Sequence, residues 1–218
     1  MLDEAQYPRY SNVRYDSIIA WSIDNLSSIT FIVTGSEVGV LRGFLKLDDP
    51  SSPLYSRYRR EILVNKSTRE QSLGFLKAGM KELKASITPG ELEEAIDTLN
   101  GVVGWLTYYG YYRGVRKLAH SKALSMVLSE GAKLVASELE KVIAPSRARY
   151  IAILKAIAHG ASTWSEIKAY VTAKTGAITS SRLSALLKNL IRYSYIDKAE
   201  DKYKITDPLV KHTVLNLL

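Results

Sequence analysis

Two adjacent carboxylates stand near the start of the sequence, in the segment LDEAQ (2–6). In many nucleotide-hydrolysing proteins, an apolar run that ends in Asp-Glu closes the strand facing a magnesium ion. The first carboxylate orients the ion through its water shell, and the second polarises the water that attacks the γ-phosphate. Only Met1 and Leu2 precede Asp3 and Glu4 here, so we expect the strand that would carry the pair to be missing.

The composition favours a folded protein with one large domain or two to three small ones. Apolar residues make up 46% of the 218 residues, which is enough for genuine cores. No apolar run approaches the ~18 residues needed to span a membrane. The absence of cysteine excludes disulfides, thiolate metal sites and cysteine nucleophiles, and the three histidines are too scattered to ligate a metal. We therefore expect a cytoplasmic, metal-free protein that does not bind membranes.

Basic charge is concentrated in the C-terminal third. The net charge is +8, and from Ser146 onward there are 12 Lys or Arg residues but only five Asp or Glu residues. The first 145 residues contain 18 basic and 17 acidic residues and are nearly neutral. An anionic partner is therefore expected to bind the C-terminal third.

The first 64 residues have the pattern of part of an α/β sheet. A helix is expected over residues 15–26, and the run ITFIV (29–33) has the continuous apolar character of a strand buried on both faces. The run ends in the polar tip TGSE (34–37), and open α/β sheets bind their ligands at such tips. Residues 61–64 are a second short strand candidate.

Helices are predicted between residues 67 and 145. The segments STRE (67–70) and TPGE (88–91) are read as capping boxes, in which the first and last side chains cap each other's backbone N–H groups. They begin helices over about 68–84 and 89–99, and two more helices are expected over 104–115 and 122–142. The tyrosines between 108 and 112 are expected to pack these helices, and a stacking platform for nucleic-acid bases is the alternative.

The last segment has the element order of a winged helix-turn-helix. Helices are expected over about 147–159, 164–174 and 179–193, followed by short strands at 195–196 and 203–205 around a polar turn. In the third helix a leucine stripe with spacings of i, i+3, i+4 and i+7 is expected to face the core.

The opposite face of that third helix is a candidate surface for the major groove of double-stranded DNA. Lysines of the wing, Lys202 among them, would reach the phosphates. The candidate residues on the helix are Ser181, Arg182, Ser184, Lys188 and Arg192.

Five segments together make the sequence resemble the archaeal ATPases of the P-loop class, relatives of the STAND and AAA+ proteins. They are LDEAQY (2–7), FIVTGSEVGVL (31–41), SPLYSRYRREILV (52–64), GVVGWL (101–106) and the winged helix that begins at WSEIK (164–168). The resemblance runs over essentially the whole chain. It implies an α/β remnant of a P-loop NTPase sheet in residues 1–64, a mostly α-helical lid in 65–145 and a winged helix-turn-helix in 146–218.

The resemblance also implies roles for individual residues of the first domain. Asp3 would coordinate Mg²⁺, and Glu4 would be the catalytic base for the hydrolysis of ATP. Thr34 and Ser36, at the tip of the sensor strand, would read the γ-phosphate. Arg57 would approach phosphate, with Ser56 standing where the family usually has glycine.

The lid would touch the nucleotide through Gly101 and Gly104, although Val103 stands where the family has proline. The phosphate-binding loop of the family, Gly-x-x-x-x-Gly-Lys-Ser/Thr, occurs nowhere in the 218 residues. We therefore expect a truncated or split ATPase that retains Walker B-like and sensor segments. The family implies ATP and Mg²⁺ as cofactors, but this chain by itself is expected neither to bind them well nor to hydrolyse ATP.

Two hypotheses about function follow. In the first, the chain belongs to an ATP-driven switch, and its exposed strand edges pair with an N-terminal ATPase fragment or with a second copy. In the second, it is a DNA-binding regulator that acts through its basic winged helix. The winged helix could instead be a regulatory arm that packs against its own ATPase.

Overall fold

The computed structural model describes residues 1–218, the side chain of Arg9 excepted. The chain forms two compact units. The first comprises Met1–Ile62 and Ser184–Ile196, and the second comprises Leu63–Leu183 and Asp197–Leu218. The expected domain boundaries at 64/65 and 145/146 stay predictions.

Residues 1–62 contain a 3-10 turn, η1 (Tyr7–Tyr10), and two helices, α1 (Tyr15–Asn25) and α2 (Val38–Phe44). α1 confirms the helix predicted over 15–26, whereas α2 was not predicted. The two helices share a small core with the loops around them. The core residues are Ile19, Ala20, Leu45 and Leu54, with Phe31, Val33, Leu41, Phe44 and Leu47 packed against them.

The predicted α/β sheet in residues 1–64 is wrong. The run 29–33 forms no strand, and its backbone joins the N-terminal segment through a single parallel bridge between Leu2 and Val33. Residues 61–64 are irregular and their side chains are exposed. A strand needs a neighbour that pairs along its length, and Leu2 offers one pairing only. In the part of the chain that the structure describes, the only sheet is a C-terminal hairpin.

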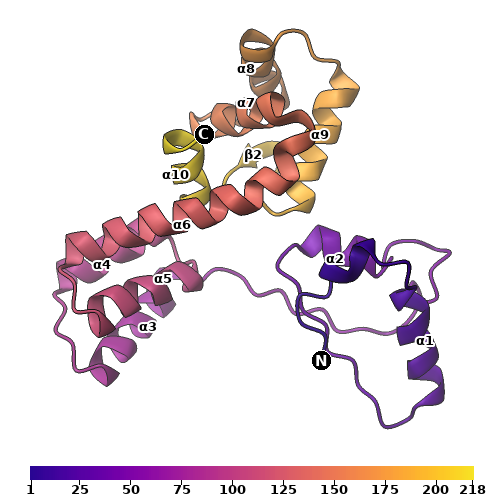
Figure 1. Cartoon of the computed structure of the whole chain (residues 1–218), viewed down its shortest axis with the longest axis horizontal. Coiled ribbons are helices and arrows are strands. Elements are labelled where there is room, and N and C mark those ends of the chain that lie inside the picture. Colours follow the sequence, from indigo (N-terminus) through magenta and orange to yellow (C-terminus); the bar gives the residue numbers. More distant parts are fainter. The chain divides into compact units, whose positions relative to one another are not determined.

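The second unit is mostly helical (Figure 1). Its helices before the winged helix are α3 (Arg69–Glu82), α4 (Pro89–Leu99), α5 (Val103–Gly110) and α6 (His120–Ile143).

Capping boxes begin α3 and α4. The box at 88–91 is confirmed, since Thr88 and Glu91 cap each other's backbone N–H groups. The predicted box at 67–70 is wrong by one residue, because the structure uses Thr68 and Gln71 instead. Both registers offer a hydroxyl followed three residues later by a side-chain oxygen, so the motif alone does not distinguish them.

α5 continues into a π-helical turn, Tyr111–Val115, before the chain reaches α6. Tyr109 and Tyr112 are buried, so they pack the helices as predicted. Tyr108 and Tyr111 differ, because 44% and 45% of their surfaces remain exposed.

The C-terminal region has the predicted winged-helix order: α7 (Arg147–Ala158), α8 (Trp164–Thr175), α9 (Ser180–Arg192), β1 (Asp197–Ala199) and β2 (Lys202–Lys204). The strands lie closer together in sequence than expected. A two-residue turn at Glu200 and Asp201 joins them, with φ angles of +48° and +63°. Two consecutive positive φ angles match the right-handed twist of a tight hairpin.

The last helix, α10 (Pro208–Asn216), packs closely on α6. A methyl group added at Gly131 of α6 would lie 2.1 Å from Leu209 Cδ2, so glycine permits the close approach. Within the described residues, none of the helices combines the length and the apolar character required to cross a bilayer.

Candidate functional site

The two carboxylates predicted from the sequence lie beside the polar residues at 34–36. The Leu2 N–H donates to the Ile32 carbonyl at 2.8 Å, and the Thr34 N–H donates to the Leu2 carbonyl at 2.9 Å. This pairing brings Asp3 and Glu4 next to Thr34 and Ser36. We call these four residues the carboxylate corner.

Thr34 connects both acidic residues. Its hydroxyl donates to Asp3 Oδ1 and accepts the Glu4 backbone N–H at 3.2 Å. One side chain therefore orients the first carboxylate and fixes the backbone of the second. A hydrogen bond to an ionised carboxylate is stronger than one between neutral groups, which favours this arrangement.

The Glu4 side chain is held in the corner by several donors. Its Oε2 accepts from Ser36 Oγ at 2.9 Å, from the Ser36 N–H at 3.3 Å and from the Gln6 amide. Its backbone is left-handed, with φ of +45°, a conformation uncommon for a residue other than glycine. The surrounding hydrogen bonds thus hold Glu4 in one defined orientation.

Gln6 and Gly35 complete the corner and were not singled out from the sequence. Gln6 is 1% exposed, and a Cβ at Gly35 would lie 2.5 Å from Gln6 Oε1. A larger residue at position 35 would therefore force the Gln6 side chain to move. The residue types gave no signal of this, because neither an amide nor a glycine indicates acid–base chemistry by itself.

The corner fits Mg²⁺ only together with a phosphate ligand. Its carboxylates and hydroxyls supply the oxygen atoms that Mg²⁺ prefers, and this ion usually keeps several waters and binds through one or two carboxylates plus phosphates. Among the described side chains, no group of three or more His, Asp or Glu residues could hold a metal ion. A nucleotide would therefore have to provide the remaining ligands.

Arg57 interacts with Asp24 of α1, and no contact to the carboxylate corner is found for it. Its guanidinium pairs with both Asp24 oxygens, one of them at 2.7 Å, and its Nε donates to the Pro53 carbonyl at 2.8 Å. Hydrogen bonding to Arg57 lowers the pKa of Asp24, and the same bond raises the pKa of Arg57. The predicted phosphate role of Arg57 would thus require it to leave this ion pair.

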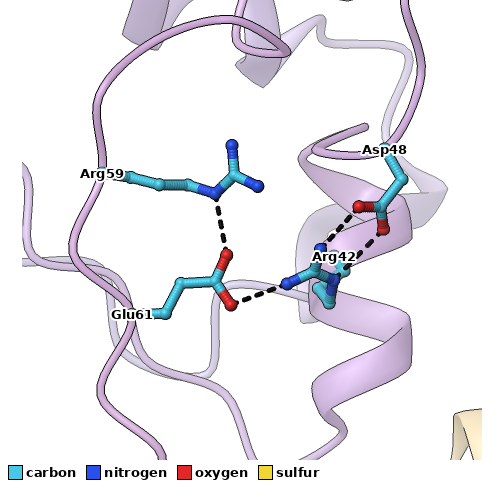
Figure 2. A network of polar contacts seen from close by, with 4 residues as sticks. All are labelled: Arg42, Asp48, Arg59 and Glu61. Atoms are coloured by element: carbon cyan, nitrogen blue, oxygen red, sulfur yellow. Dashed lines mark hydrogen bonds and ion pairs between the residues drawn. The ribbon is translucent and has the colours of Figure 1, made fainter.

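An ion-pair network fixes the basic segment that follows Arg57 (Figure 2). Arg42 of α2 lies between two acids, with Nη1 2.7 Å from Glu61 Oε2 and Nε 3.1 Å from Asp48 Oδ2. Arg59 Nε donates to the other Glu61 oxygen at 2.8 Å. Hydrogen bonding to arginine lowers the pKa of both Asp48 and Glu61. Arg59 therefore stabilises the local fold here, which the sequence did not indicate.

The two glycines predicted to contact nucleotide have different surroundings. Gly101 has φ of +71°, and a Cβ there would lie 2.2 Å from the Ser67 carbonyl oxygen. The Ser67 N–H donates to the Gly101 carbonyl at 2.9 Å. Gly104 lies in the first turn of α5 with no atom near the position of a Cβ. The backbone conformation and the contact with Ser67 are enough to explain why glycine stands at position 101. Contact of either glycine with nucleotide stays a prediction.

The candidate DNA-binding residues are mostly exposed, and the leucine stripe of α9 is buried as predicted. The buried residues are Leu183, Leu186, Leu187 and Leu190. The exposed ones are Ser181, Arg182, Lys188 and Arg192 on α9 and Lys202 on β2, while Ser184 is half-buried.

Further polar contacts surround the start of α9. Arg182 Nη2 donates to Ser146 Oγ at 3.1 Å, and Lys168 Nζ lies 3.3 Å from Ser180 Oγ. The Lys168 ammonium also lies 5.1 Å from the Trp164 ring centroid. Lys168 was not singled out from the sequence, although its position near a helix-turn-helix junction could have suggested it.

Comparisons with known proteins agree with this organisation. The model of the MCM protein C-terminal winged helix-turn-helix domain matches residues 144–206. The structure of the Walker-type ATPase PABY2304 of Pyrococcus abyssi matches with a TM-score of 0.90 and 37% sequence identity. The match covers 98% of this chain and 61% of that ATPase. A search among curated proteins found no match.

The winged helix and the similarity to a Walker-type ATPase fit an ATPase-related protein or a DNA-binding winged-helix protein. The assignment to STAND or AAA+ relatives in particular stays a prediction.

Proposed function

We propose that this chain is part of a Walker-type ATPase and contributes the Walker B-like carboxylates to its active site. The carboxylate corner is the observation that carries the proposal. Asp3 is positioned by Thr34, and Glu4 is positioned by Ser36 and Gln6. The likeness to the Pyrococcus abyssi ATPase supports the same conclusion.

Each residue of the corner has a definite task in this proposal. Asp3 would hold Mg²⁺ together with the nucleotide phosphates, and the ion would neutralise charge that develops on them. Glu4 would accept a proton from the attacking water. Thr34 and Ser36 would keep the two carboxylates apart and correctly directed, and a γ-phosphate would compete for their hydroxyl groups.

A phosphate-binding loop has to come from sequence other than these 218 residues. We propose that the segment carrying it packs against the exposed apolar side chains of residues 29–33. Apolar side chains support this, because Ile29 and Ile32 remain 44% and 57% exposed. Exposed apolar side chains of this kind favour burial against a second polypeptide.

Phosphate release from ATP in the presence of Mg²⁺ tests this function. The full chain is measured alone and with a polypeptide that carries a glycine-lysine phosphate loop. We expect hydrolysis only with the added polypeptide. Glu4→Gln should lower the rate by about 10²–10⁴-fold, the usual contribution of a general base.

The matched control is Glu70→Gln, which changes an exposed acid on α3. It should leave the rate unchanged. Equal rates for Glu4→Gln and the unsubstituted chain would rule out Glu4 as the base, and failure of every loop-bearing polypeptide to restore hydrolysis would refute the ATPase assignment.

A second candidate function is binding of double-stranded DNA by the winged helix. The exposed basic residues of α9 and the match of residues 144–206 to a winged helix-turn-helix favour it. In the wing, Lys198 pairs with Asp201 at 2.6 Å. Lys202 and Lys204 are exposed and are therefore the better candidates for phosphate contacts.

Fluorescence anisotropy with a duplex of ~20 base pairs measures this binding. Arg182→Ala, Lys188→Ala and Lys202→Ala should each weaken it, and each should reduce the slope of log K against log salt by about 0.9. Lys77→Ala, on α3, is the control and should bind normally. Unchanged anisotropy at low salt would show that the winged helix does not bind duplex DNA.

A further inference from the structure

The short segment between β2 and α10 is attached to helices α3–α5 at two neighbouring residues, Thr206 and Asp207. The carbonyl of Thr206 accepts from the Asn100 side-chain amide at 3.4 Å and from the Lys66 ammonium. Asn100 is the residue that ends α4, and Lys66 precedes α3. One backbone carbonyl thus joins the end of the wing to both helices.

Asp207 makes the second attachment. Both of its carboxylate oxygens lie 3.1 Å from the indole Nε1 of Trp105 on α5. The same side chain caps α10 by accepting the Leu209 N–H at 2.8 Å. A single carboxylate therefore positions α10 and ties it to α5.

Helices α5, α6 and α10 pack closely together next to Asp207. A Cβ built at Gly131 of α6 would lie 3.2 Å from the Trp105 ring and 2.1 Å from Leu209. Leu209 and Thr213 are both 0% exposed, and the Thr213 hydroxyl lies 3.4 Å from the Ala132 carbonyl oxygen. Close-packed interiors transmit displacement, so α5, α6 and α10 cannot shift independently.

The wing itself is fixed to this assembly. The Tyr203 N–H in β2 donates to the Ser162 carbonyl, between α7 and α8, at 2.7 Å. Ser162 is hydrogen-bonded to Tyr203 of β2, and Asp207 follows Tyr203 by four residues and contacts Trp105. A displacement of the wing would therefore be passed directly to Trp105.

We propose that Trp105 and Asp207 form a latch that couples the winged-helix hairpin to helices α3–α6. The latch makes the two parts move as one body, so a ligand on the wing would change the mobility of the helical region. It needs neither ATP nor DNA and is independent of the function proposed above.

Amide hydrogen exchange of the full chain tests the latch through two substitutions. Trp105→Phe keeps an aromatic ring against Gly131 and removes the indole N–H. Asp207→Ser keeps a good N-cap for α10 but is too short to reach the indole. Because a hydrogen bond to a charged group is worth on the order of tenfold or more in an opening equilibrium, each should raise exchange about tenfold in residues 197–213. Exchange in residues 66–68 and 100–105 should rise with it.

The double variant decides whether the two residues act together. Coupling predicts that Trp105→Phe and Asp207→Ser combined exchange no faster than either alone, because both break the same bond. Tyr108→Phe is the control and should not alter exchange, because it keeps the ring whose centroid lies 5.9 Å from that of Trp105 and removes only a hydroxyl. Additive effects, or faster exchange confined to α10, would overturn the proposal. Circular dichroism verifies that each variant is folded.

Discussion

Gly101 follows Asn100, and both residues have left-handed backbone conformations at the end of α4. The position of Ser67 depends on that turn. We predict that Gly101→Ala lowers the free energy of unfolding by at least ~2 kcal/mol, since a Cβ would clash with the Ser67 backbone at a strained φ. Urea unfolding measures this.

Gly104→Ala is the matched control for that substitution, because open space surrounds Gly104. It should leave stability unchanged or raise it by up to about 1 kcal/mol, as alanine favours a helix over glycine. If both substitutions cost the same, the turn at Gly101 is not the reason for the glycine.

The buried side chain of Tyr109 makes the stability of the fold depend on pH. It is fully buried, its hydroxyl lies 2.8 Å from His120 Nδ1, and burial raises its pKa to about 12, with nearby Glu91 adding to the effect. A raised folded-state pKa stabilises the fold below the unfolded value near 10. That contribution is lost as pH rises through about 12.

We therefore predict that Tyr109→Phe costs roughly 1 kcal/mol at neutral pH, from the lost hydrogen bond. Its stability difference from the unsubstituted chain should shrink above pH ~10 by roughly 1 kcal/mol per pH unit, because phenylalanine does not ionise. Urea unfolding of both proteins at about pH 9 and about pH 11 measures the difference. A constant difference would contradict the assigned environment of Tyr109.

At the scale of elements, the start of α3 offers two overlapping capping boxes, Ser67 with Glu70 and Thr68 with Gln71, of which the structure forms the second. The side chain of Thr68 caps the Gln71 N–H. Thr68→Ala should thus destabilise the protein by about 1 kcal/mol. Ser67→Ala should change stability by only a few tenths of a kcal/mol, and chemical denaturation distinguishes the two. An equal loss of stability in the two variants would contradict Thr68 as the capping residue.

Elements were predicted best where the information is local. Helices α1, α3, α4 and α6–α9 follow from apolar periodicity and caps, which act over a few residues. The run 29–33 fails as a strand because strand formation depends on a partner outside the run. α2 was missed, since Val38–Phe44 contains two glycines that weaken any helix signal.

At the scale of the whole molecule, residues 58–67 form no helix or strand, with Tyr58 and Val64 96% and 88% exposed. We predict that trypsin first cuts after Arg60, because exposed irregular backbone is the preferred site of nicking. Glu61→Gln should speed this cut by releasing Arg42 and Arg59. Mass spectrometry of early products identifies the site, and first cuts inside α3–α8 would disprove the prediction.

The sequence by itself determined most of the helical segments, the winged-helix order and the basic C-terminal third. These follow from residue type, periodicity and charge, which are local or additive properties. Only the tertiary structure decided that Thr34 holds Asp3, that Arg57 pairs with Asp24 and that Asp207 binds Trp105. Those contacts join residues 31, 33 and 102 positions apart, and the folded chain brings such distant side chains together only through the packing of many others.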